Sequence, residues 1–264
     1  MTTTTSPPTP SAATLTGSGR SVPQHVRDLV ARVTGDEKHD PSAHSTLDVV
    51  WTLYDQVLRV DPARPDAPDR DRFLLSKGHG PASTYAVLAA KGFFPARWLD
   101  DVASFDSPLG HHPDRTLVPG VEIGSGSLGH GLPLAVGLAL GLRGRSPARV
   151  VVLVGDAELD EGSNAEAIQV AGRFGLGNLT CVVVDNHSDN LGWPGGIAPR
   201  FALEGWAATE VRTHDQPRLT AALRHTEPDR PTVVVVDTTG SPTGTPTGSS
   251  TGSSTGSSTG KEAA

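Results

Sequence analysis

The sequence predicts an α/β fold with a doubly wound, mostly parallel sheet and helices on both of its faces. Three short β-branched runs, at residues 150–154, 180–184 and 232–236, are continuously apolar. Parallel strands that are covered on both faces have this composition, because neither side of the strand meets water. Segments with helical spacing separate the runs, and this alternation is typical of a sheet whose ligands lie beyond the carboxyl ends of its strands.

Several segments carry the helical pattern that such a sheet needs. Two of them, at residues 47–60 and 164–174, have one apolar face each. These faces consist of Val50, Trp51, Tyr54 and Leu58 in the first segment and of Ala167, Val170, Ala171 and Phe174 in the second. A further helix begins near Pro81, a residue suited to a first helical turn, and stops before Gly92. The run 132–140 is apolar enough to form a buried helix.

The two ends of the chain differ from its middle. Residues 1–21 are rich in Thr, Ser, Pro and Ala, and residues 240–264 repeat a Ser-Thr-Gly unit. Such segments are too polar to offset the entropy lost on ordering, so we expect both to be disordered tails. The remaining residues, 22–239, have the length of one α/β domain.

Net charge and cysteine content limit the classes of function. A formal net charge of -7 argues against a general nucleic-acid binder, which would neutralise phosphates with clustered Lys and Arg. The single cysteine, Cys181, lies in an apolar run and cannot form an intrachain disulfide, so it fits the core of a protein in the reducing cytoplasm. With neither a secretory signal pattern nor an apolar stretch long enough to span a bilayer, the chain predicts a soluble protein without a membrane partner.

Groups able to bind a metal and a phosphate stand just after the first two apolar runs. Gly155 and Asp156 follow the first run, and Asn186 and Ser188 follow the second. Mg²⁺ prefers oxygen ligands and usually takes some of them from a bound phosphate. Asp156, the amide oxygen of Asn186 and a main-chain carbonyl would supply the protein's ligands, while Gly155 lets a phosphate approach the backbone. The helix beginning near Ser163 would present its positive end to the same anion.

The stretch 155–186, GDAELDEGSNAEAIQVAGRFGLGNLTCVVVDN, resembles the thiamine diphosphate motif, which begins with Gly-Asp-Gly and ends in Asn. Three upstream blocks resemble transketolase segments in the same order: RFLLSKGHG at 72–80, GHHPD at 110–114 and PGVEIGSGSLGHG at 119–131. Over residues 25–238 the chain is therefore similar to the N-terminal part of a single-chain transketolase. The resemblance implies a thiamine diphosphate-binding fold. Because bacteria often split the enzyme near this point, it also implies the N-terminal subunit of a split, two-component transketolase.

The resemblance assigns roles to individual residues. Asp156, Asn186 and the carbonyl of Ser188 would hold Mg²⁺. The residues implied to bind thiamine diphosphate are Gly155, Asp156, Ala157, Glu161, Asn186, Gly126, Leu128 and His79. Within this set, Gly126 and Leu128 match the loop whose backbone meets the aminopyrimidine, and Glu161 matches a carboxylate near the dimer interface. The residues implied to be catalytic are His79, His112 and His39, which match histidines lining the substrate channel and would donate to oxyanions or move sugar hydroxyl protons.

The chain departs from the family's pattern at three places. Ala157 replaces the second Gly of the motif, which would crowd the approach of the diphosphate, and His130 replaces the Gln of a Leu-Gly-Gln-Gly loop. No histidine follows His225, although the family has a cofactor-facing His after its last strand. In the acidic cluster at 158–161, only Glu161 has a family counterpart, and we expect the whole cluster to be a solvated helix start.

We expect an enzyme subunit that binds thiamine diphosphate and Mg²⁺ and transfers a two-carbon ketol unit from a ketose phosphate, in a specialised biosynthetic pathway. It would be active only with a partner, a C-terminal transketolase subunit that carries the pyrimidine-binding domain and the activating glutamate, in an α₂β₂ assembly. Partner binding should bury apolar surface around residues 76–81 and 162–174.

Two alternatives stay open on the sequence. In the first, the same cofactor passes a two-carbon or acyl unit to a carrier-protein or lipoyl thiol. In the second, the chain is a non-catalytic scaffold subunit that has lost cofactor binding, which Ala157 and the shortened loop after the last apolar run favour. The motifs do not encode the donor, the acceptor or the identity of the partner.

Overall fold

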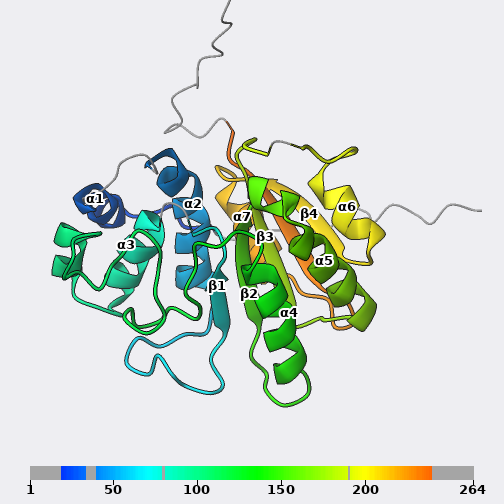
Figure 1. Ribbon diagram of the computed structural model, residues 1–264, viewed down its shortest axis with the longest axis horizontal. Helices are drawn as coiled ribbons and strands as arrows, with labels where there is room; N and C mark the ends of the chain where they lie inside the picture. Colours follow the sequence, from blue (N-terminus) through cyan, green and yellow to red (C-terminus); the bar gives the residue numbers. More distant parts are fainter. Residues whose placement is uncertain (1–18, 34–39, 79–80, 190, 240–264) are drawn as a thin grey trace, which may run out of the picture.

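The computed structural model describes residues 19–33, 40–78, 81–189 and 191–239, and the predicted tails lie outside this part apart from residues 19–21. The described residues form a three-layer α/β unit (Figure 1). Its strands are β1 (Arg72–Leu75), β2 (Val150–Gly155), β3 (Leu179–Asp185), β4 (Ala207–Arg212) and β5 (Thr232–Asp237). Its α-helices are α1 (Gln24–Arg32), α2 (Asp40–Thr52), α3 (Ala82–Lys91), α4 (Gly131–Leu142), α5 (Gly162–Phe174), α6 (Ile197–Leu203) and α7 (Gln216–Arg224). Shorter turns are the π turn η2 (Leu53–Val57) and the 3-10 turns η3 (Ala96–Asp101) and η4 (Ala157–Asp160).

The five strands are all parallel, in the order β1-β2-β3-β5-β4. The predicted parallel α/β fold is therefore confirmed, and the three apolar runs form the central strands β2, β3 and β5. The strands β1 and β4 were not predicted from the sequence. Both lie at edges of the sheet: β1 has four residues, and β4 leaves half of its side chains exposed, so neither has a long apolar run.

Helices cover both faces of the sheet and enclose two apolar cores. On one face, α1, α2, α3 and α7 pack against strand residues such as Leu153 and Val182. On the other face, α4, α5 and α6 pack against the intervening residues, such as Val152 and Val183. In Figure 1, α1–α3 gather on one side of the sheet and α4–α6 on the other. Because side chains alternate between the faces of a strand, one continuous apolar run supplies both cores. Cys181 is buried in β3, as predicted.

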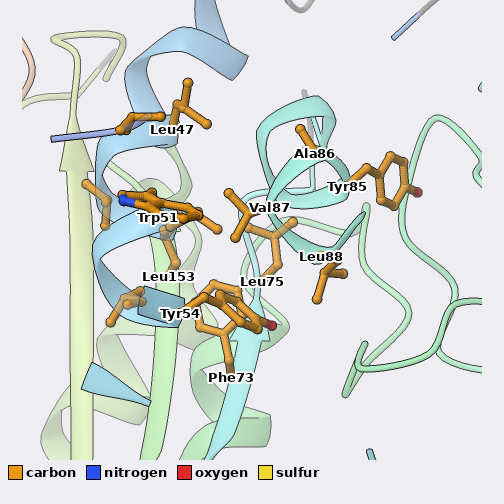
Figure 2. Close-up of a cluster of buried hydrophobic side chains, with 14 of the residues drawn as sticks. Leu47, Trp51, Tyr54, Phe73, Leu75, Tyr85, Ala86, Val87, Leu88 and Leu153 are labelled. Carbon is orange, nitrogen blue, oxygen red and sulfur yellow. The ribbon is translucent and has the colours of Figure 1, made fainter. Parts of the chain in front are cut away.

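The predicted helix at 47–60 divides into two pieces. The α-helical turns of α2 give way to η2, and the chain is extended at Leu58. Figure 2 shows Trp51 and Tyr54 within the buried cluster that also contains Phe73 of β1. The rings of Tyr54 and Phe73 meet edge to face with centroids 5.5 Å apart. This ring contact holds β1 against η2.

The buried face of α5 differs from the predicted one. Its buried residues are Asn164, Ala167, Ile168 and Ala171. Val170 and Phe174 were predicted to share this face, but they are 39% and 52% exposed, so the prediction was wrong for these two. Positions three and four apart form the inward stripe of a helix, and these two residues lie to one side of it.

The neighbouring helices follow the sequence pattern more closely. As predicted, α3 begins after Pro81 and ends at Gly92, whose φ of 87° closes the helix. The prediction of a buried helix holds for only one face of α4, because Leu134 and Leu140 are 50% and 38% exposed. Within the described part of the chain, no helix is long and apolar enough to cross a membrane.

Candidate functional site

The carboxyl ends of β2 and β3 meet at one edge of the sheet and carry the residues predicted to bind a metal. Gly155 pairs with Val184, so Asp156 and Asn186 follow neighbouring strands. The N–H of Asp156 donates to the carbonyl of Val184 at 3.1 Å, which fixes the backbone one residue beyond the strand. Asp156 is buried, with 2% of its surface exposed.

Ser188 connects Asp156 to Asn186. Its N–H and its hydroxyl donate to the two carboxylate oxygens of Asp156, at 2.5 and 2.8 Å. The same hydroxyl lies 2.8 Å from Oδ1 of Asn186, and the N–H of Asp189 donates to Asp156 at 3.3 Å. The structure thus brings together the three residues that were predicted to hold Mg²⁺.

A left-handed residue turns the chain so that this convergence occurs. His187 has a φ of 56°, a conformation that histidine tolerates better than most residues, and its N–H donates to Oδ1 of Asp185 at 3.1 Å. Burial raises the pKa of Asp185, against the lowering effect of His187, and the charges of Asp156 and Asp237 add to the rise. A cation bound at this edge would offset the repulsion between these carboxylates.

The potential metal ligands that converge at this edge are all oxygen atoms. They are a carboxylate from Asp156, an amide oxygen from Asn186 and the oxygens of Ser188, a set that suits a hard cation such as Mg²⁺. Among the described residues, no three His, Cys, Asp or Glu side chains cluster where they could share a metal. A cation at this site would depend on amide and main-chain oxygens as well as on one carboxylate.

The loop at residues 124–131, here called the glycine loop, contacts one of the predicted catalytic residues. Gly126 has a φ of 125°, and a Cβ added there would come within 2.9 Å of the His112 ring, so only glycine fits. A Cβ at Gly78 would lie 2.6 Å from the N of Gly126. His112, Gly126 and Gly78 form one packed group, while Leu128 of the same loop is 38% exposed.

The other predicted residues are spread around these two clusters or fall outside the described part. Ala157 opens η4 and is half-buried. Glu161 is exposed at the start of α5, and His130 is exposed at the start of α4. His39 and His79 lie outside the described residues, so the structure does not place them.

Threonines stand after β5, where a histidine was expected from the resemblance. The N–H and hydroxyl of Thr238 both donate to the carbonyl of Asp185 at 3.0 Å. The N–H and hydroxyl of Thr239 donate to the carboxylate of Asp237 at 2.8 and 2.6 Å. The bonds of Thr238 tie the end of β5 to the end of β3, whereas those of Thr239 stay within the end of β5.

Glu158 is buried, with 2% of its surface exposed, so its prediction as part of a solvated helix start was wrong. Its Oε1 accepts hydrogen bonds from the hydroxyl of Ser76 and from the N–H of Gly129, the latter at 3.0 Å. Its Oε2 lies 3.4 Å from the N–H of Gly155. The physical reason is the turn η4, which directs this side chain inward instead of continuing into α5. Burial raises the pKa of Glu158, and these hydrogen bonds and the charge of Lys77 oppose the rise.

Lys77 places a positive charge beside the same strand end. A Cβ added at Gly155 would lie 3.5 to 3.7 Å from the side-chain carbons of Lys77, so the two residues are in contact. Burial lowers the pKa of Lys77 to about 8, and the carboxylates of Asp156 and Glu158 act in the opposite direction. An anion bound against Gly155 would have this ammonium group as a neighbour.

Glu158, Lys77 and Ser76 were not predicted from the sequence as parts of this site. Ser76 and Lys77 lie in a block from which only His79 was assigned to the site and which was otherwise expected at the partner surface. Glu158 lies in an acidic run typical of a helix start. The pairing of Ser76 with Glu158 joins residues from separate strands, and no local pattern predicts it. An available clue was the SKG sequence after an apolar RFLL run, which is typical of a strand followed by a polar loop.

Comparison with known proteins gives a consistent result. Residues 25–264 match the family described as "Transketolase, thiamine diphosphate binding domain". The chain is 54% identical over 213 residues to a protein of Rhodococcoides fascians named "Ferredoxin fas2", a match that covers 80% of this chain and 70% of that protein. It is 36% identical over 209 residues to one of the subunits of an apulose-4-phosphate transketolase of Actinobacillus succinogenes, a match that covers 76% of each chain.

Solved structures add the likeness of the fold. The transketolase from Leishmania mexicana matches 78% of this chain with a TM-score of 0.64 and 25% sequence identity. The match occupies only 37% of that transketolase chain. This chain therefore spans little more than a third of the length of that relative.

Proposed function

This chain belongs to the transketolase family, as its thiamine diphosphate binding domain, and on that premise we propose that it is the cofactor-holding subunit of a two-component transketolase. With its partner it would transfer a two-carbon ketol unit from a ketose phosphate to an acceptor. The observation that carries the proposal is the convergence of Asp156, Asn186 and Ser188 at the ends of two neighbouring strands.

The residues at this edge fit a magnesium-bound diphosphate. Asp156, the side-chain oxygen of Asn186 and the carbonyl of Ser188 would ligate Mg²⁺, which prefers oxygen donors and takes others from the diphosphate. Gly155 would leave the backbone open to the phosphates, and Lys77 would neutralise part of their charge. The methyl group of Ala157 is the only addition to the family's Gly-Asp-Gly pattern here. Bound thiamine diphosphate supplies the carbanion chemistry, and the protein supplies orientation and charge.

His112 is the predicted catalytic residue that the structure describes. Its ring packs against Gly126 of the glycine loop, whose counterpart in the family meets the aminopyrimidine. From this place an imidazole can donate to an oxyanion through one ring nitrogen or accept a sugar hydroxyl proton on the other. His79 and His39 are proposed to line the same channel.

Exposed apolar side chains on α4 and α5 are the proposed contact with the partner. Leu134 of α4 and Phe174 of α5 are each about half exposed, and the two helices pack against each other. This refines the partner surface expected around residues 162–174, whereas Ser76 in the other expected segment is buried. The partner would be a C-terminal transketolase subunit with the pyrimidine-binding domain and the activating glutamate, in an α₂β₂ assembly. The Actinobacillus succinogenes relative is itself named as one subunit of its transketolase, which is consistent with this division.

Two other functions are compatible with the family. The cofactor would hand its unit to a carrier-protein or lipoyl thiol, or the chain would be a scaffold that no longer binds cofactor. The word "Ferredoxin" in the name of the Rhodococcoides fascians relative does not make iron–sulfur binding a third candidate function. This chain has one cysteine, whereas an iron–sulfur cluster is held by several. The intact oxygen cluster around Asp156 favours cofactor binding over the scaffold.

An assay with purified chains separates these functions. The chain would be mixed with a C-terminal transketolase subunit from the same source, thiamine diphosphate, Mg²⁺, a ketose phosphate and an aldose acceptor, and the products would be identified by mass. We expect two-carbon transfer only in the complete mixture. Loading of free lipoamide instead of the aldose would support the thiol alternative, and the lack of any cofactor binding by calorimetry would leave the scaffold.

The cellular setting is a further part of the proposal. We assign the enzyme to a specialised biosynthetic pathway and to the reducing cytoplasm, the latter because Cys181 is a buried, unpaired thiol. Complementation of a bacterial strain that lacks its housekeeping transketolase, by this chain with its partner, would contradict the specialised role.

A further inference from the structure

We propose that Glu158 is a positioning residue that sets the glycine loop, the backbone of Gly155 and the segment after β1 at fixed distances for the cofactor. The inference rests on the proposed function, since it concerns the same site. It goes beyond that function because neither the motif nor the resemblance gave Glu158 a role in holding the cofactor.

One carboxylate group joins three segments that are distant in sequence. Oε1 of Glu158 accepts from the hydroxyl of Ser76, which follows β1, and from the N–H of Gly129 in the glycine loop. Oε2 faces the N–H of Gly155 at the end of β2, at 3.4 Å. The separations of these segments from one another are therefore set through a single side chain.

Each segment that Glu158 contacts stands next to a residue proposed to meet the cofactor. Gly129 follows Leu128, in the loop proposed to face the aminopyrimidine. Gly155 precedes Asp156, which is proposed to bind Mg²⁺, and Ser76 precedes Lys77 beside the diphosphate. A ligand that is held at both its ring and its diphosphate requires these groups at one fixed spacing, because misplaced groups contribute little.

Further bonds hold Glu158 and the glycine loop in place. The hydroxyl of Ser76 accepts from the N–H of Gly131 at 3.0 Å, so the end of the glycine loop is bound to the same pair. A Cβ at Gly131 would overlap Ser76, and only glycine permits this approach. The side-chain amide of Asn164, buried in α5, donates to the carbonyl of Glu158 at 2.6 Å and fixes its backbone.

The test variant is Glu158→Gln, which keeps the size of the side chain but turns one oxygen into an N–H₂ group. In Glu158 one carboxylate oxygen accepts from Ser76 and Gly129 and the other faces Gly155. The amide of glutamine has only one oxygen, and its N–H₂ group donates, so it cannot accept at both of these positions. The matched control is Glu166→Gln, the same change at an exposed position of α5. Both would be made in the full chain.

The first readout is local hydrogen exchange without cofactor. We expect exchange across the glycine loop, which includes the amides of Gly129 and Gly131, to accelerate about tenfold in Glu158→Gln, equivalent to about 1.4 kcal/mol of local opening. Exchange in β3 and in residues 150–154 of β2 should stay as in the wild type, because none of these amides faces Glu158. An unchanged glycine loop would overturn the inference, and so would equal acceleration in the central strands, which would indicate support of the core alone.

The second readout is the affinity for thiamine diphosphate with Mg²⁺ in the complex with the partner, by calorimetry. We expect about tenfold weaker binding in Glu158→Gln and none of this loss in Glu166→Gln. Binding of wild-type strength in Glu158→Gln would overturn the inference. If Glu158→Gln does not fold, Ser76→Ala replaces it with the same expected directions, because it removes one of the bonds to the carboxylate. Failure of the proposed function would be distinct, since the wild type itself would then bind no cofactor.

Discussion

Replacement of Asp156 by alanine gives the most direct test of the cofactor site. The variant removes the only carboxylate of the proposed magnesium-binding set and the acceptor of three hydrogen bonds, two from Ser188 and one from Asp189. Two different losses follow from this change. One affects the binding of Mg²⁺ and thiamine diphosphate, and the other affects the stability of the unliganded fold.

The size of each loss can be estimated from these contacts. Removal of a group that only supports a metal ligand costs 10- to 100-fold in metal affinity, so removal of a ligand should cost at least about 100-fold, or about 2.8 kcal/mol. A hydrogen bond to a charged group contributes about 1.5 to 3 kcal/mol. Water can replace part of the lost bonding because Ser188 is exposed, so we expect about 2 kcal/mol lower stability overall. For a domain of this size that corresponds to a fall in Tm of about 4 to 8 °C.

The assay is calorimetric titration of thiamine diphosphate with Mg²⁺ into the complex with the partner, together with thermal unfolding of the chain. The matched control is Asp189→Ala, which removes a carboxylate from the same loop and keeps the N–H that donates to Asp156. Cofactor affinity within threefold of the wild type in Asp156→Ala would refute the assignment of the metal site. An equal loss of cofactor affinity in Asp189→Ala would show that binding depends on the net charge of the loop and not on Asp156 as a specific ligand.

Three further predictions concern the neighbouring groups. Ser188→Ala keeps the carbonyl ligand and removes the hydroxyl that donates a hydrogen bond to Asp156. Calorimetry should therefore show Mg²⁺-dependent binding of thiamine diphosphate that is unchanged or up to about fivefold tighter. A tenfold loss of affinity would contradict this prediction. Because burial lowers the pKa of Lys77 to about 8 and a bound anion favours its charged form, wild-type affinity for the cofactor should fall as pH rises through about 8. Lys77→Met should bind the cofactor about tenfold more weakly at neutral pH and should lack this pH dependence. The same pH profile in both proteins would exclude a contribution of the lysine to cofactor binding. Phe174→Asp should abolish co-sedimentation of the chain with its partner while leaving Tm unchanged. Phe105→Asp, at a fully exposed apolar residue elsewhere, should leave co-sedimentation intact. Normal assembly of Phe174→Asp would move the interface away from α5.

Local patterns in the sequence predicted the central part of the fold well. The runs that became β2, β3 and β5 were recognisable because central parallel strands are apolar on both faces. The edge strands were harder to recognise: β1 has only four residues, although its last three side chains are buried, and β4 leaves half of its side chains exposed. For α5, the period of the apolar residues predicted a helix but did not identify which stripe faces inward, and Val170 and Phe174 were assigned to the wrong side.

The candidate site was predictable to the extent that its residues follow strand ends. Asp156 and Asn186 stand directly after recognisable strands, and Ser188 follows two residues later. Parallel strands bring their carboxyl ends to one edge of the sheet. Ser76 and Glu158 could not be paired in this way, because their contact depends on the inward turn of η4 and on the order of β1 and β2 in the sheet.

The sequence by itself determined that this chain is a parallel α/β domain with oxygen donors at its strand ends, because those features depend on composition and on short-range order along the chain. Only the tertiary structure decided that Glu158 is buried, that Lys77 lies against Gly155, and that α4 and α5 keep apolar side chains exposed. These facts depend on which segments meet across the sheet. Burial of a charge and pairing across strands are properties of the packed molecule. A sequence pattern predicts burial only where the spacing of residues along a single helix or strand determines it.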